Sequence, residues 1–172
     1  MSSTLLVSIP EAEPVTARYW PAWEPPKPRG VPAHVSVLFP FLRRRELTTE
    51  AIALIGEAAG GVDPFDVAFA RTGRFEWTVF LVPEPAAPFS ELAQRLVERF
   101  PTAKPYRGFH GDVLNPHLTV LTCADAEALD RAEAEVRKSL PVRSRVQELW
   151  LLVEDDHGGW KRRHTFSLGI AP

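Results

Sequence analysis

The chain has little cysteine, no long apolar run and no excess of positive charge, and each shortage excludes a class of protein. One cysteine, Cys123, stands among 172 residues, so we expect neither an internal disulfide nor a cysteine-built metal site. No apolar segment approaches the roughly 20 residues that cross a bilayer. The start, M-S-S-T-L-L-V-S-I-P, lacks the features of a secretory signal. We therefore expect a cytoplasmic protein without membrane attachment.

The charges are nearly balanced. The sequence carries 20 Lys and Arg against 22 Asp and Glu, a net charge of -2. A protein that grips duplex DNA through many phosphates needs a basic surface, so we expect no duplex DNA partner, while a small phosphorylated ligand stays possible. The length and the hydrophobic fraction of 45% fit one soluble domain, which we expect to be a monomer.

Hydrophobic periodicity and turn residues predict the secondary structure. Strands are expected at 4–9, 34–39, 64–75, 77–84, 117–122, 142–154 and 160–169. Helices are expected at 49–59, 89–100 with Ser90 as the cap, and 125–140. A short helix also fits between residues 11 and 23, before a proline-rich link.

The two halves of this series run in the same order: histidine strand, helix, strand, strand. A shift of 83 residues carries His34 to His117 and Ser36 to Thr119, which indicates an internal duplication. We predict one domain over residues 1–172 with pseudo-repeats at about 31–84 and 114–170. Hairpins covered by helices predict an α+β fold, bilobal and duplicated, with two antiparallel sheets flanked by helices around a central cleft.

Each histidine strand places a hydroxyl residue two positions after its histidine. Side chains at i and i+2 share one face of a strand, so His34 lies beside Ser36, and His117 lies beside Thr119. A lone histidine in a strand is more often structural than catalytic, but the same pair in both repeats favours chemistry. Facing sheets would bring two imidazoles and two hydroxyls together.

That set of groups suits a phosphodiester. In-line displacement at phosphorus needs a base for the nucleophile and an acid for the leaving oxygen, and imidazoles change charge near neutral pH. The hydroxyls can donate to the non-bridging oxygens. The pattern predicts cleavage with no metal and no cofactor, and it leaves open which histidine is the base.

The motifs H-V-S-V and H-L-T-V, the proline before the second motif, and the P-F-D-V-A-F-A-R-T-G-R-F strand carry a family resemblance. From about His34 to its end, the chain resembles the 2H phosphoesterase superfamily, especially the 2'-5' RNA ligase-like, RNA 2',3'-cyclic phosphodiesterase branch. The resemblance implies cleavage of cyclic nucleotide phosphates or RNA ends, with His34, Ser36, His117 and Thr119 as the catalytic set. Its implied partner is a nucleotide or RNA with a cyclic or terminal phosphate. Many relatives have a basic residue after the second motif, where this chain reads L-T-C.

Five further residues are candidates for substrate binding. Phe39 can stack on a base, Arg43 can reach a phosphate, and three residues precede the second motif in a loop: Tyr106, Arg107 and His110. Two other functions stay open, 2'-5' RNA ligation and a nucleotide or RNA-end binding module with little turnover. A metal-dependent hydrolase is disfavoured because the histidine pair lacks nearby carboxylates at ligand spacing.

Overall fold

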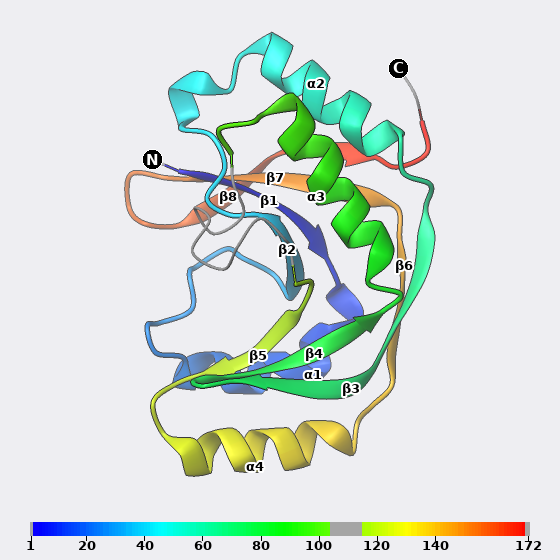
Figure 1. The fold of residues 1–172 in the computed structure, drawn as a ribbon. Coiled ribbons are helices and arrows are strands. Elements are labelled where there is room, and N and C mark those ends of the chain that lie inside the picture. The colour runs from blue at the N-terminus through cyan, green and yellow to red at the C-terminus, as the bar shows by residue number, and fades with distance from the viewer. Residues whose placement is uncertain (1, 104–114, 171–172) are drawn as a thin grey trace.

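The computed structural model describes residues 2–103 and 115–170 and shows an α+β fold (Figure 1), which confirms the predicted class. Its strands are β1 (Ser3–Ser8), β2 (His34–Leu38), β3 (Phe65–Phe75), β4 (Thr78–Glu84), β5 (Leu118–Thr122), β6 (Val142–Val146), β7 (Glu148–Glu154) and β8 (Trp160–Ser167). Its α-helices are α1 (Glu13–Thr16), α2 (Thr49–Gly60), α3 (Ala87–Arg99) and α4 (Ala126–Arg137). Short 3-10 helices are η1 (Pro10–Ala12), η2 (Ala17–Ala22) and η3 (Arg44–Glu46).

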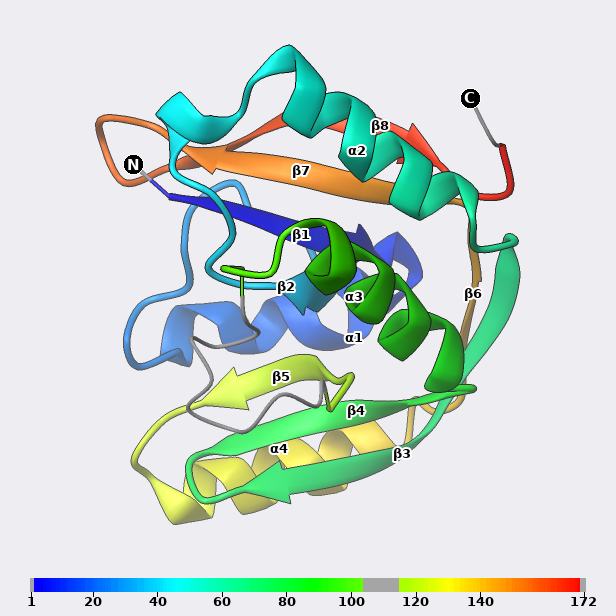
Figure 2. The ribbon, with the colours of Figure 1, turned by 45° about the horizontal axis from the view of Figure 1, so that its top comes forward.

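The strands form one curled antiparallel sheet in the order β6-β3-β4-β5-β2-β1-β7-β8. Its two halves meet between β5 and β2, where Val35 opposite Leu118 is the only residue pair recorded between these strands as described. The two predicted sheets are therefore the two four-stranded halves of a continuous sheet. Figure 2 shows β8, β7, β1 and β2 in one half and β5, β4 and β3 in the other, with β6 at the outer edge beside β3. Helices α2 and α3 pack on the half that contains β2 and β8. Helices α4 and η2 pack on the half that contains β5.

One boundary prediction is wrong because of pairing between distant strands. The segment 142–154, expected as a single strand, divides at Gln147 into β6 and β7. Strand β6 pairs with β3, whereas β7 pairs with β1 and β8. The chain crosses from one half of the sheet to the other at this point, and no local signal marks that change of partner.

The start of helix α3 also differs from the prediction. The helix begins at Ala87, and Ala86 occupies the N-cap position without a side-chain hydrogen bond. Pro88 lies in the first turn, where a residue without an N–H is tolerated because the first N–H groups have no partner within the helix. Ser90 is therefore inside the helix and does not cap it.

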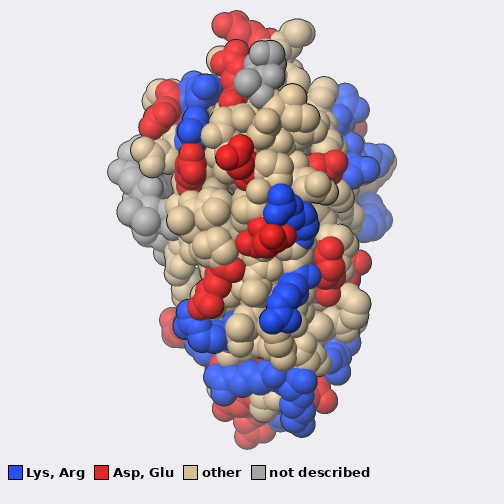
Figure 3. All heavy atoms as spheres, turned by 90° about the vertical axis from the view of Figure 1, so that its right-hand side faces the viewer, with Lys and Arg blue, Asp and Glu red and all other residues tan. Residues whose placement is uncertain are grey.

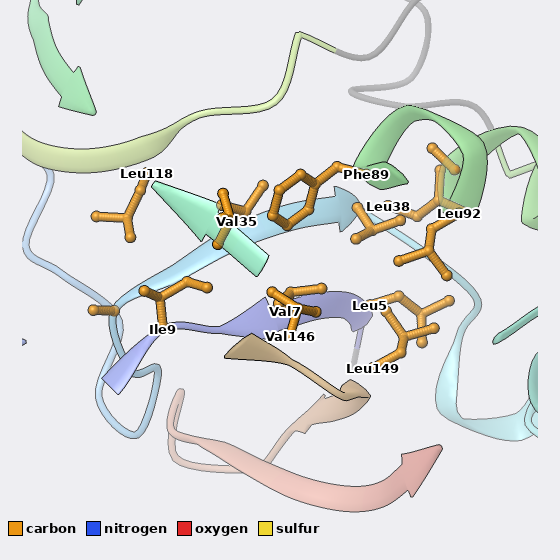
Figure 4. Packing of buried hydrophobic residues seen from close by; sticks show 14 of the residues in the cluster. Leu5, Val7, Ile9, Val35, Leu38, Phe89, Leu92, Leu118, Val146 and Leu149 are labelled. Carbon is orange, nitrogen blue, oxygen red and sulfur yellow. The ribbon is translucent and has the colours of Figure 1, made fainter. Parts of the chain in front are cut away.

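The core holds the backbone of both motif strands in place. Val35 and Leu118 are fully buried, and they lie in one cluster with Val7 of β1 and Phe89 of α3 (Figure 4). Because side chains alternate across a strand, burying these residues turns the histidines to the opposite face.

The surface carries both signs of charge. On the face shown in Figure 3, Lys and Arg side chains are interspersed with Asp and Glu side chains. Within residues 2–103 and 115–170, no helix has the length and apolar character to span a membrane.

Candidate functional site

The junction of the two half-sheets brings the two histidine motifs together. Val35 lies opposite Leu118, and antiparallel register then sets each histidine opposite the hydroxyl residue of the other motif: His34 opposite Thr119, and Ser36 opposite His117. Opposed residues share a face, so all four side chains project from the same side of the sheet. The two histidines stand on a diagonal of this arrangement, where neighbouring strands hold residues about 7–8 Å apart.

Burial alternates along both strands as this arrangement requires. The four motif side chains are partly buried, while Val35, Val37, Leu118 and Val120 between and beside them are fully buried. In the described part of the chain, neither the Ser36 hydroxyl nor the Thr119 hydroxyl has a hydrogen-bond partner. Both hydroxyls can therefore donate to a ligand without losing a bond within the protein.

The two imidazoles are anchored in the same way. His34 Nδ1 lies 2.8 Å from the Pro32 carbonyl oxygen, and His117 Nδ1 lies 2.8 Å from the Asn115 carbonyl oxygen. A carbonyl oxygen only accepts, so each Nδ1 carries the hydrogen and donates it. In the neutral form the lone pair is then on Nε2 of both rings. Two backbone carbonyls, each two residues before its histidine, thus fix the same neutral tautomer in both rings.

His34 is neutral at physiological pH. Burial is the main cause that lowers the pKa of its imidazole to about 4; the charges of Lys27 and His117 act in the same direction, and the bond to the Pro32 carbonyl acts against them. Lys27 itself lies 3.9 Å from the centre of the Trp20 ring, and its Nζ donates to the Val31 carbonyl. Burial also lowers the pKa of Lys27. The segment that leads into His34 therefore carries a cation beside the site.

His117 packs against two aromatic rings of the β3–β4 hairpin. Its ring centre lies 5.2 Å from those of Phe75 and Phe80. Phe80 is opposite Thr119 on one side and Gly73 on the other, so it shares the face of the second motif. A Cβ at Gly73 would come within 2.4 Å of the Phe80 ring, and glycine is what lets that ring lie over β3.

Sequence reasoning missed these aromatic neighbours and Lys27. The sequence predicts hairpins, but it does not predict that β4 pairs with β5. Only that pairing places Phe80 beside the second motif. A glycine within a strand signals a close approach of another group, and Gly73 was such a signal.

Of the five predicted substrate-binding residues, the structure describes Phe39 and Arg43. Phe39 packs against Trp160 of β8, with ring centres 6.1 Å apart. Arg43 is exposed at the start of η3, and its backbone N–H donates to the Glu46 carboxylate at 2.8 Å. The other three, Tyr106, Arg107 and His110, lie outside the described residues.

A metal site is not formed by the described side chains. Within residues 2–103 and 115–170, no group of three or more His, Cys, Asp or Glu residues is placed to hold a metal ion. The donors that surround the motifs are imidazoles and hydroxyls, a set suited to proton exchange and to hydrogen bonding with an anion.

Solved structures share this fold over nearly the whole chain. A Thermus thermophilus protein, TT0787, superimposes with a TM-score of 0.67 at 20% identity over 100% of both chains. A structure described as a phosphoesterase gives 0.62 at 17% identity over 97% of both chains. E. coli LigT in complex with ATP gives 0.57 at 16% identity over 97% of both chains. At these identities the likeness establishes the fold.

The family assignment comes from the sequence profile. No curated protein sequence matches the chain, but the profile of the 2'-5' RNA ligase superfamily matches residues 8–158. That span contains both histidine motifs and the strands from β2 to β7. Membership supports an enzymatic activity of the phosphoesterase or ligase type. The chain therefore belongs to the 2'-5' RNA ligase superfamily.

Proposed function

We propose that this protein is a metal-independent phosphodiesterase that opens a cyclic phosphate on a nucleotide or at an RNA end, with two histidines as base and acid. The observation that carries the proposal is the matched anchoring of the two imidazoles. Both Nδ1 atoms donate to a backbone carbonyl at 2.8 Å, which supports Nε2 of each ring as the atom that exchanges a proton. Residues on one face of two adjoining strands then hold the base and the acid around one phosphorus atom.

In this mechanism His34 is the base, because its lowered pKa keeps the ring neutral in the free protein. Its Nε2 accepts a proton from water as the water oxygen bonds to phosphorus. The bond from phosphorus to one ribose oxygen breaks, and His117, in its protonated form, gives its Nε2 proton to that oxygen. The products are a phosphomonoester and a neighbouring hydroxyl.

The hydroxyls of Ser36 and Thr119 stabilise the charge that develops on the non-bridging oxygens. Each is partly buried and has no partner in the part of the chain that the structure describes. A donor held in place before the reaction needs little reorganisation when charge builds up, which is why such groups lower barriers effectively.

The ligands of a structural relative support a nucleotide substrate. Structures of E. coli LigT hold ATP, 3'-AMP and NADP+, and each of these carries a phosphate on a nucleoside. The reverse reaction, with the same two histidines as acid and base, would join a cyclic-phosphate RNA end to a 5'-hydroxyl end. The name of the superfamily favours testing this ligation as a second activity.

The test is turnover of 2',3'-cyclic AMP by the wild type and by His34→Ala and His117→Ala. Removal of either group should lower kcat by about 10²- to 10⁴-fold, and EDTA should leave the wild type unchanged. The control is His157→Ala. This histidine is exposed in the β7–β8 turn and uses its backbone N–H to bond Asp155, so alanine keeps the bond.

Full turnover in either motif variant would refute the mechanism, and loss of turnover in EDTA would refute metal independence. Binding of 3'-AMP without any turnover of the cyclic nucleotide would point to a binding module. A joined product from RNAs with cyclic-phosphate and 5'-hydroxyl ends would establish ligation.

A further inference from the structure

The β3–β4 hairpin presents an aromatic ring that stays partly exposed. Phe75 is 43% exposed, whereas Phe80 beside it is 7% exposed. The two rings lie 4.4 Å apart at an interplanar angle of 32°, and His117 meets Phe75 edge-on at 5.2 Å. Phe75 is therefore the outer layer of a stack whose inner layer is buried against the second motif.

The outer ring is held by its neighbours. Phe80 supports one side of Phe75, and Gly73 allows Phe80 to lie close to the backbone of β3. An aromatic ring fixed in this way loses little conformational freedom when a flat ligand stacks on it. Trp77, at the tip of the same hairpin, is 61% exposed but has no ring contact within the described residues, so it lacks such support.

We infer that Phe75 is the stacking platform for the nucleobase of the substrate, next to the phosphate held at His117. This inference rests on the proposed function and names the part of the substrate that the hairpin binds. A nucleobase is one ribose away from its own phosphate, and the centre of the Phe75 ring lies 5.2 Å from that of His117. Stacking on an aromatic ring is largely indifferent to the identity of the base, so all four cyclic nucleotides should be accepted with similar KM.

The experiment compares two substrates with the same reacting group. The first is 2',3'-cyclic AMP, and the second is glycerol 1,2-cyclic phosphate, which has no base. Loss of one base-stacking contact should raise KM for cyclic AMP about tenfold to a hundredfold without a matching fall in kcat, because stacking acts on the bound substrate and the transition state alike.

We expect Phe75→Ala to raise the KM for cyclic AMP, divided by the KM for glycerol cyclic phosphate, about tenfold to a hundredfold. Phe75→Leu, which keeps apolar bulk beside His117 but lacks the flat ring, should raise it as well. Phe75→Trp should keep the wild-type ratio. Trp77→Ala is the matched control on the same hairpin and should leave both substrates unchanged.

Equal effects of Phe75→Ala on the two substrates would overturn the inference, since they would mean that Phe75 acts only through His117. An unchanged ratio would overturn it too. Calorimetric binding of 3'-AMP and of glycerol phosphate to the same variants separates this inference from the proposed function. If neither cyclic phosphate is hydrolysed, the phosphodiesterase proposal fails, and a selective loss of 3'-AMP binding in Phe75→Ala still supports the platform. Equal binding by the wild type and Phe75→Ala, or no binding of 3'-AMP at all, refutes it.

Discussion

Replacement of Gly73 by alanine should disturb the candidate site through one intermediate ring. The new Cβ would lie 2.4 Å from Cε2 and 2.5 Å from Cζ of Phe80, whereas carbon atoms in contact prefer about 3.5–4.0 Å. The Phe80 ring must therefore move by about 1 Å or more. It is buried against Phe75 and His117, so its movement displaces the imidazole.

A displacement of about 1 Å in a catalytic group costs on the order of 10²-fold in rate. We expect Gly73→Ala to lower kcat for 2',3'-cyclic AMP by about that factor. Crowding a packed site destabilises by about 1–3 kcal/mol, and the lower entropy of the unfolded alanine chain offsets about 0.4–1 kcal/mol of it. The protein should therefore stay folded, which urea unfolding of the same sample checks.

The double variant with Phe80→Leu isolates the cause. Leucine has neither Cε2 nor Cζ, so in that background the alanine at position 73 meets no ring. Phe80→Leu lowers turnover by itself, but adding Gly73→Ala should then change kcat little, giving a coupling energy of about 2–3 kcal/mol between the sites. Full turnover in Gly73→Ala, or the same loss in both backgrounds, would refute the argument.

Three other predictions concern the acid–base pair, the hydroxyls and a helix cap. Burial, and after it Lys27, lower the pKa of His34 to about 4. A base must be neutral, so kcat/KM should fall as the pH drops through about 4. A fall on the acidic side that is centred near pH 6.5 would contradict the assignment of His34 as the base. Lys27→Met removes a positive charge and should move the acidic fall of kcat/KM to higher pH. Ser36→Ala and Thr119→Val should each lower kcat about a hundredfold while the free energy of unfolding changes by less than about 0.5 kcal/mol; destabilisation without loss of turnover would show a structural role. The carboxylate of Asp125 accepts from two backbone N–H groups at the start of α4. Asp125→Ala should lower the free energy of unfolding in urea by about 1 kcal/mol and leave kcat unaltered. Unchanged stability would mean that the cap is dispensable.

Local patterns predicted most elements of the fold. Helix α2 begins at Thr49, as the predicted range 49–59 has it, and the Thr48 hydroxyl caps its start by accepting from the Ala51 N–H. The β3–β4 hairpin follows from the two strands predicted at 64–75 and 77–84, although β4 begins at Thr78 and not at Trp77. Periodicity also set the faces of the motif strands, since Val35 and Leu118 are fully buried and the histidines are only partly buried. Each of these features depends on residues a few positions apart.

The elements around the motifs needed the tertiary structure. No local signal separates β6 from β7 at Gln147, because their change of pairing partner depends on strands far away in the chain. The sequence does not distinguish Phe75 and Phe80 from other hairpin residues. Only the pairing of β4 with β5 places Phe80 beside the second motif. Lys27 lies seven positions before His34, and the folding of the proline-rich link sets its charge beside the imidazole.

The sequence by itself determined the two motifs, their faces and the α+β class, because propensity and alternation act over short stretches of chain. The tertiary structure decided that β2 meets β5 at Val35 and Leu118, and thus that two histidines 83 residues apart share one site. It also decided which rings surround His117. Such contacts form only when burial of the whole core repays the entropy lost in bringing distant segments together.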